Sequence, residues 1–429
     1  MTGFAPDELA ARGGPPPSAR GNATAREIAI TVVLLFALPI LVYYLWFCLA
    51  FNQGQLTLPS AEMLDRLPLP TMTSVAIAGG WLTFQILLQI YAPGKWVEGT
   101  PLSDGTRLKY KLNGWSAWWF TWAVLVAAVA LQLFSPAIVA DQFGALLTTA
   151  TVFSYLFSFY LYWHGKRFGS EHERVTSSAI YDFWLGTALN PRIGSFDLKL
   201  FCEARPGLIA WVAIDFSLAA KQYQLHGIVT VAMILVCAFH FWYVTDYFLN
   251  EEAILTTWDI KHERFGWMLC WGDLVWVPFT YTIQAHYLVE HTHDVPWWGV
   301  VGIVALNVAG YVIFRGANIQ KHRFRQHHGQ LIWGKPAEFI TTSRGSLLLT
   351  SGWWGLSRHM NYFGDLLMGL AWCLPCLFES PLPYFYVAYL SVLLVHRERR
   401  DHGMCAARYG KEWDRYCARV RYRIVPGVY

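Results

Sequence analysis

Long runs of apolar residues alternate with short polar connections along most of the chain. The clearest run extends from Ile28 to Phe51 and contains no charged side chain. A helix needs about 20 such residues to cross roughly 30 Å of hydrocarbon, so each run predicts a membrane-spanning helix. About ten spans are expected, and the fifth and tenth of them are short: 27–51, 72–92, 115–134, 143–164, 207–220, 228–249, 267–289, 297–315, 361–378 and 383–396.

The composition agrees with lipid as the surrounding solvent. Of the 429 residues, 55% are hydrophobic, 17% are aromatic and only 14% are charged, against roughly 25% charged in soluble domains. We therefore predict an all-α integral membrane protein that contacts membrane lipid. No internal repeat, no separate soluble domain and no nucleic-acid partner are expected, and the pattern predicts no particular oligomeric state.

Lysine and arginine gather in alternate connections, as they do on the cytoplasmic side of membrane proteins. The N-terminal tail, the second, fourth and eighth connections and the C-terminal tail are basic, whereas the odd-numbered connections are short or acidic. Both termini are therefore expected in the cytoplasm, at a bacterial inner membrane or the endoplasmic reticulum. We divide the chain into a disordered cytosolic tail (1–26), N-terminal transmembrane helices (27–260) and a C-terminal transmembrane half with the pocket (261–429).

Polar and charged residues crowd the last third of the chain, where apolar helices make each of them unfavourable unless it faces a cavity or a partner. Between Leu347 and Asp365 they alternate with aromatic residues. Aromatic faces and an arginine fork suit a cofactor with flat rings and phosphates; a polar interfacial helix with snorkelling ends is the other interpretation. The residues concerned are Trp353, Trp354, Arg358, His359, Asn361, Tyr362 and Asp365.

Two further groups of polar residues flank this segment. Lys321 and Arg325 follow the eighth span at helical spacing and offer cations for a phosphate, or simply a cytoplasmic anchor. Arg397 and Asp401 are four residues apart, so on a helix they share a face, either at the mouth of a pocket or as a surface pair.

The cysteines and histidines show no pattern of a disulfide framework or a metal site. Cys373 and Cys376 lie in a predicted span without the βαβ context of a redox motif, so buried free thiols are expected. The histidine groups lack the carboxylate or thiolate spacing of metal ligands, and no metal is predicted.

Two long motifs resemble the signatures of the sterol reductase family. The first runs from Tyr181 to Gly194 and reads Tyr-Asp-Phe-Trp-Leu-Gly-Thr-Ala-Leu-Asn-Pro-Arg-Ile-Gly. The second is Leu394-Val-His-Arg-Glu-Arg-Arg-Asp401, followed by Tyr409-Gly410. Shorter stretches at 250–257, 272–278 and 314–321 are also similar to the family, so that the resemblance covers about residues 105–429.

This resemblance implies reduction of a sterol ring double bond by proton addition and hydride transfer from NADPH. Since no Gly-x-Gly-x-x-Gly is present, a Rossmann domain is not the binder. The resemblance implies Tyr243 as the proton donor, with Asp401 or Asp246 assisting if burial raises the carboxyl pKa; a packed aromatic is the other interpretation of Tyr243. The implied cofactor residues are Lys321, Arg325, Trp354, Arg358, His359, Asn361, Tyr362, Asp365, Arg397, Asp401, Tyr409 and Tyr416.

The resemblance is strongest to the sterol C14 reductases and the reductase part of the lamin B receptor. Lys221-Gln222 and Leu331-Ile-Trp-Gly334 are instead similar to the 7-dehydrocholesterol reductases, so a Δ7 enzyme is the first alternative. A non-catalytic sterol-binding protein and a membrane methyltransferase that uses S-adenosylmethionine are the others. C14=C15 is the double bond that we expect to be reduced.

Overall fold

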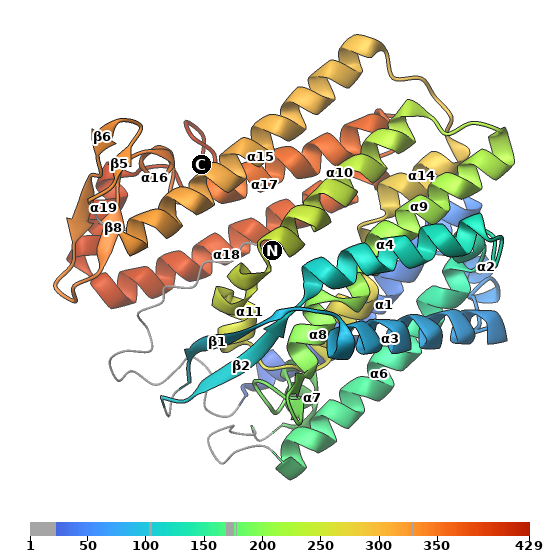
Figure 1. The fold of residues 1–429 in the computed structure, drawn as a ribbon, viewed down its shortest axis with the longest axis horizontal. Coiled ribbons are helices and arrows are strands. Elements are labelled where there is room, and N and C mark those ends of the chain that lie inside the picture. Colours follow the sequence, from blue (N-terminus) through green and yellow to red (C-terminus); the bar gives the residue numbers. More distant parts are fainter. Residues whose placement is uncertain (1–22, 103–104, 169–175, 177, 328) are drawn as a thin grey trace. The chain divides into compact units, whose positions relative to one another are not determined.

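The computed structural model describes residues 23–102, 105–168, 176, 178–327 and 329–429. The described residues form helices and four short antiparallel two-stranded sheets (Figure 1). Contacts divide the chain into two compact units, separated between His293 and Asp294, and each is described by itself. Most of the predicted cytosolic tail lies outside the described residues.

The prediction of an all-α membrane protein is confirmed. Each of the ten predicted spans contains helical residues, and the described part of the chain contains five helices that are long and apolar enough to cross a membrane. The number of ten spans and the cytoplasmic termini stay predictions. The five helices are α1 (Ala25–Phe51), α3 (Met72–Tyr91), α6 (Phe143–Phe168), α10 (Val231–Leu249) and α15 (Trp297–Gln326).

The seventh predicted span differs most from a regular helix. Over 267–289 the backbone forms separate short segments around a π-helical turn. Pro278 lies within this stretch and has no N–H to donate, which weakens a continuous helix there. The segments are α12 (Trp267–Trp271), the π turn η2 (Gly272–Trp276), α13 (Val277–Thr280) and α14 (Ile283–Glu290).

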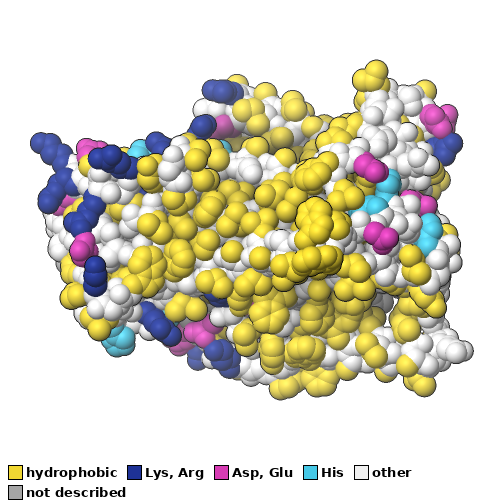
Figure 2. Space-filling view, turned by 90° about the horizontal axis from the view of Figure 1, so that it is seen from above, with side chains coloured by type: hydrophobic (Ala, Val, Ile, Leu, Met, Phe, Trp, Pro, Cys, Tyr) yellow, Lys and Arg dark blue, Asp and Glu magenta, His cyan; other side chains and the backbone are white. Residues whose placement is uncertain are grey.

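The outer surface is largely apolar. On the face that Figure 2 shows, hydrophobic side chains predominate over wide areas. Along α1, for example, Val33, Phe36 and Ile40 are each more than 60% exposed. Surfaces of this extent are unusual in soluble monomers and suit contact with lipid.

Short elements connect the long helices of the first unit. The hairpin of β1 and β2 packs Tyr110 and Leu112 against Leu200 and Ala204 in a buried cluster. The elements are α2 (Ala61–Asp65), β1 (Lys95–Pro101), β2 (Arg107–Leu112), α4 (Gly114–Ala130), α5 (Ile138–Asp141), α7 (Ala179–Leu185), β3 (Arg192–Ile193), β4 (Phe196–Asp197), α8 (Leu198–Ala204), α9 (Pro206–His226), η1 (Glu251–Thr256) and α11 (Trp258–His262).

A buried ion pair joins several of these elements. Arg205, just before α9, places its Nη2 atom 2.6 Å from Oε1 of Glu251. The same guanidinium donates to Gln89 on α3 and to Asn113 at the start of α4, and the other Glu251 oxygen accepts the N–H of Gly114. Nη1 of Arg205 has no hydrogen-bond partner among the described residues, but pairing and the other hydrogen bonds are the means by which a protein tolerates buried charge.

In the second unit, α15 packs closely on α17 (Met360–Cys373). A Cβ atom on Gly310 would lie 2.7 Å from the carbonyl oxygen of Gly364, and one on Gly364 would lie 2.6 Å from that of Gly310. Small residues permit this backbone approach, as in other membrane helix pairs. Farther along the two helices, Trp372 donates from its indole N–H to Asn307 at 3.1 Å.

The remaining elements of the second unit surround the end of α15. One apolar cluster packs Phe324 of α15 against Leu349 and Trp354, and another gathers Trp413, Tyr416 and Val420. The elements are β5 (Leu331–Ile332), β6 (Lys335–Pro336), β7 (Phe339–Thr341), β8 (Leu347–Leu349), α16 (Trp353–Leu356), η3 (Leu374–Cys376), η4 (Leu382–Tyr384), α18 (Phe385–Tyr409) and α19 (Lys411–Arg419).

Candidate functional site

The last turns of α15 meet α16 through a cation and an aromatic ring. Lys321 Nζ lies 3.8 Å from the centroid of the Trp354 ring, and the Trp354 indole N–H donates to the carbonyl oxygen of Ala317 at 2.8 Å. Gly352, with φ of +64°, turns the chain into α16, and the next N–H, from Trp353, donates to Gln320. Lys321 and Trp354, which the sequence singled out separately, therefore belong to one cluster.

The link between α16 and α17 is held by the C-terminal segment of the chain. The Ser357 hydroxyl donates to the carbonyl oxygen of Ile424, and the Arg358 N–H donates to that of Tyr422. The buried Arg358 side chain donates from Nη1 to the Cys417 sulfur at 2.7 Å. These contacts hold the Arg358 guanidinium against the C-terminal segment of the chain.

A histidine and a carboxyl group face each other beside an aromatic ring. His359 Nε2 lies 3.5 Å from Asp401 Oδ2, and the imidazole stacks on Tyr362 at 4.7 Å. Burial, together with the nearby Lys321 and Arg358, lowers the pKa of His359 to about 3, so the imidazole is neutral at pH 7. Burial raises the pKa of Asp401, and Lys321 opposes this shift. The pair is thus a neutral imidazole beside a carboxyl group whose pKa is above its ordinary value.

Several buried polar atoms near this cluster have no hydrogen-bond partner among the described residues. They are Oδ1 of Asn318 on α15, Nε of Arg358, and Oδ1 of Asn361 on α17. Buried polar atoms normally have partners, so such a group of them indicates a site for a polar ligand. A donor from arginine and two amide groups, beside a tryptophan face, fit a cofactor that carries both phosphates and flat rings.

The other cofactor residues expected from the sequence also lie in the second unit. Asp365 is buried on α17, whereas Arg325 is exposed near the end of α15. Tyr409 and Tyr416 belong to the apolar cluster of α18 and α19, where burial raises the pKa of Tyr416. Arg397 lies partly buried on α18, one turn before Asp401.

Tyr243 and Asp246 belong to the first unit and lie on α10. The Tyr243 ring lies 6.1 Å from that of Trp211, a residue of α9. Asp246 is buried, and its carboxyl oxygen Oδ1 accepts from the side-chain amide of Asn250 at 3.3 Å, beside the end of α10. Tyr243 therefore lies beside the indole of Trp211, and Asp246 has a hydrogen-bond partner at the end of α10.

The structure brings together two pairs of residues that no sequence motif indicates. Cys417 contacts Arg358, and no sequence pattern indicates this contact. Asp215 and His240 face each other inside the first unit. Their positions within apolar runs were the signal that would have identified them, since ionisable residues inside membrane helices are rare.

The cysteines are as expected. All eight are free, and Cys373 and Cys376 are both fully buried. Among the described residues, no group of three or more histidine, cysteine or acidic side chains is arranged to hold a metal ion.

Comparison with known families covers nearly the whole chain. Residues 22–429 match the model described as the ergosterol biosynthesis ERG4/ERG24 family. The match includes both units of the structure and every residue of the candidate site.

Individual relatives are similar at high identity. A protein of Methylotuvimicrobium alcaliphilum named Delta(14)-sterol reductase is 55% identical over 403 residues, which are 93% of this chain and 94% of that protein. A Dictyostelium discoideum protein of the same name is 46% identical over 93% of this chain and 90% of its own. Delta(14)-sterol reductase erg24 of Schizosaccharomyces pombe is 46% identical over 86% of this chain and 88% of its own.

Proposed function

The chain belongs to the ergosterol biosynthesis ERG4/ERG24 family, and we propose that it reduces the C14=C15 double bond of a membrane-dissolved sterol. The single observation that carries this proposal is the 55% identity, over almost the full length of both chains, to a protein named Delta(14)-sterol reductase. The apolar exterior suits a protein that lies in the bilayer, where a sterol dissolves. Membership of the family also removes the membrane methyltransferase from the alternatives.

The cofactor is NADPH, held in the second unit. When bound, it supplies the hydride of the reduction. Trp354 offers a ring face, and Lys321 and Arg358 offer positive charge. The amide oxygens of Asn318 and Asn361, which have no partner within the described part of the chain, offer acceptors. His359, Asp401 and Tyr362 line the same cluster and hold its geometry.

The proton comes from the chain itself. A neutral phenol in a site without water is a suitable donor, and Tyr243 on α10 is the tyrosine that we assign to this role. Asp401, whose pKa burial raises, is the second candidate for the proton donor. Asp246 is the weaker candidate because its Oδ1 atom accepts a hydrogen bond from Asn250.

The decisive experiment offers the purified protein and NADPH a Δ8,14-diene sterol and, separately, a Δ5,7-diene, and identifies the products by mass spectrometry. We expect loss of the 14-double bond alone. Loss of the 7-double bond alone would make the protein a Δ7 enzyme. Binding of both sterols without NADPH oxidation would favour a non-catalytic sterol-binding protein.

Replacing Arg358 by Lys tests the cofactor site. Lysine keeps the charge but removes the planar fork, and the loss of hydrogen bonds to a charged group weakens binding by about 1.5–3 kcal/mol. We therefore expect the dissociation constant of NADPH, measured by calorimetry, to rise roughly 10- to 150-fold.

A matched control for this variant is Arg415→Gln, which changes an exposed arginine on α19. NADPH affinity of the control is expected to stay at the wild-type value. Unchanged affinity in Arg358→Lys itself would remove Arg358 from the cofactor site.

A further inference from the structure

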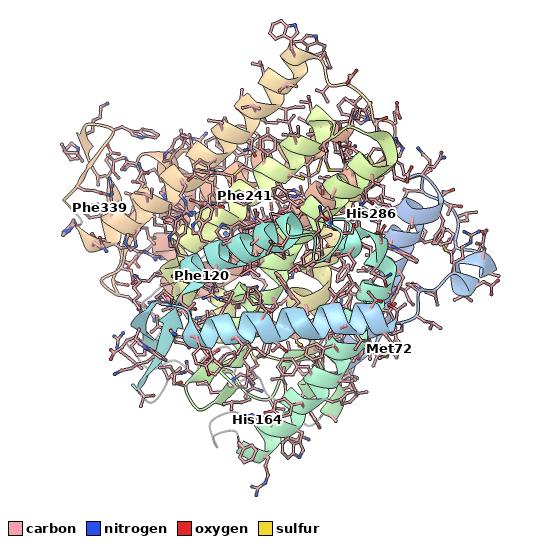
Figure 3. All side chains as sticks on the ribbon, turned by 45° about the vertical axis from the view of Figure 1, so that its right-hand side comes forward. Met72, Phe120, His164, Phe241, His286 and Phe339 are labelled. Atoms are coloured by element: carbon pink, nitrogen blue, oxygen red, sulfur yellow. The ribbon has the colours of Figure 1, made fainter. Side chains whose placement is uncertain are left out.

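Two ionisable side chains face each other in the interior of the first unit. Asp215 lies on α9 and His240 on α10, and neither side chain has any exposed surface. The imidazole Nδ1 atom is 2.8 Å from Oδ2 of the carboxyl group. His240 directly precedes Phe241, which is labelled on α10 in Figure 3. Both residues lie in apolar helices, where ionisable groups usually mark a functional site.

The hydrogen bonds of this pair admit two positions for one proton. The Trp211 indole N–H points to the same His240 Nδ1 atom, at 3.2 Å. A ring nitrogen carries either a proton or a lone pair. In the first state Nδ1 of His240 carries the proton and donates it in a hydrogen bond to the Asp215 carboxylate. In the second state Nδ1 has a lone pair that accepts from the Trp211 indole N–H, and the proton is on the Asp215 carboxyl group. The second carboxyl oxygen of Asp215 has no partner among the described residues that would favour one state.

The pair lies one helical turn from Tyr243. Residues three apart on a helix are neighbours on its surface, so His240 and Tyr243 share a face of α10. Both rings meet the same indole, since Trp211 lies 4.7 Å from the His240 ring and 6.1 Å from the Tyr243 ring. The pair therefore lies on the same face of α10 as the phenol that we assign as the donor, and shares a neighbouring indole with it.

Packing alone is a poor explanation for the pair. Apolar side chains of similar volume are often as stabilising as a buried ion pair, or more so, because they avoid the desolvation penalty. A proton that can move between the two groups, by contrast, has a use in a reaction that consumes one proton in every turnover.

We propose that Asp215 and His240 store the proton that restores Tyr243 after each turnover, an inference that rests on the proposed reductase function. As the Tyr243 O–H bond breaks, its proton forms a C–H bond on the sterol, and NADPH supplies the hydride that completes the reduction. The phenolate oxygen then takes the proton of the pair and its O–H bond forms again. The negative charge passes to the pair, and a proton from the bulk solvent neutralises it before the next turnover.

Comparison of first and later turnovers tests this role. Asp215→Asn keeps the size of the side chain but cannot hold the proton. Wild type and variant are loaded with NADPH and a Δ8,14-diene and followed by rapid quench and mass spectrometry. We expect the first turnover of the variant at about the wild-type rate, because Tyr243 begins protonated, and later turnovers at least about tenfold slower, as for the loss of a proton-transfer group.

The control is Cys237→Ser, at a residue whose sulfur lies 3.7 Å from the Asp215 main-chain carbonyl oxygen. It changes the surroundings of the pair without removing either ionisable group, and both phases should match wild type. His240→Gln gives a second variant if Asp215→Asn does not fold.

Three results would overturn the proposal. Equal slowing of the first and later turnovers would show that the pair only supports the fold, and wild-type rates in both phases would show that it takes no part. A wild-type protein that reduces none of the sterols offered would overturn the proposed function as well, whereas the first two results leave the reductase function intact.

Discussion

Tyr243→Phe is expected to abolish sterol reduction while leaving NADPH binding unchanged. Phenylalanine keeps the ring that packs beside Trp211 but has no O–H to donate. Loss of a general acid typically lowers turnover about 10²- to 10⁴-fold. The measurements are sterol product by mass spectrometry and NADPH affinity by calorimetry on the same preparation.

Tyr247→Phe is the matched control, one turn farther along α10. The Tyr247 hydroxyl is buried and has no hydrogen-bond partner among the described residues, and the substitution removes the same kind of atom from the same helix. We expect this variant to keep turnover within about threefold of wild type, the scale of an indirect packing change of under 1 kcal/mol. Wild-type turnover in Tyr243→Phe would assign the proton to another group, with Asp401 the next to test.

Replacing Arg205 by Met is expected to cause the largest loss of stability of any substitution considered. It leaves Glu251 buried without its cation, and breaking a buried pair in this way costs about 3–5 kcal/mol. The hydrogen bonds to Gln89 and Asn113 disappear at the same time. Thermal unfolding in detergent, with the yield of folded protein from the membrane, provides the measurement.

The neighbouring Glu252 gives a close control for this prediction. It pairs with Lys95 at 2.5 Å, yet both side chains are more than half exposed. Exposed pairs contribute about 0–1 kcal/mol, so Glu252→Gln should unfold close to the wild-type temperature. If both variants unfold at the wild-type temperature, the Arg205 pair is not the stabilising contact that its burial indicates.

Two adjacent glutamates thus differ in burial and in their expected effect on stability, and nothing in the sequence around them predicts this difference. Glu251 and Glu252 have the same side chain and the same local composition, and the motif around them carries no sign of which one is buried. Only the packing of η1 beside α4 and α9 decides that Glu251 accepts from Gly114 and Arg205. The same holds for Cys417, whose contact with Arg358 depends on the course of the chain after α18.

The candidate site was predicted in part. The sequence indicated Arg358, His359, Asn361 and Tyr362 together because they are neighbours in one motif. Contacts between residues far apart in the sequence could not be predicted in this way. Lys321 and Trp354 are 33 positions apart, and the 3.8 Å contact between them follows from the packing of α16 on α15. Asp215 and His240 were missed because their spacing in the sequence matches no short motif.

What the sequence alone determined is the class of the protein, since apolar runs of helical length have few other stable solutions in lipid, where every backbone polar group must be satisfied within a helix or closed barrel. It determined the family as well, through motifs that extend over many consecutive residues. The tertiary structure decided which polar residues are buried and with which partners, because burial and hydrogen bonding depend on segments far apart in the chain. The cation over Trp354, the neutral imidazole beside Asp401 and the Asp215–His240 pair all arise at that level.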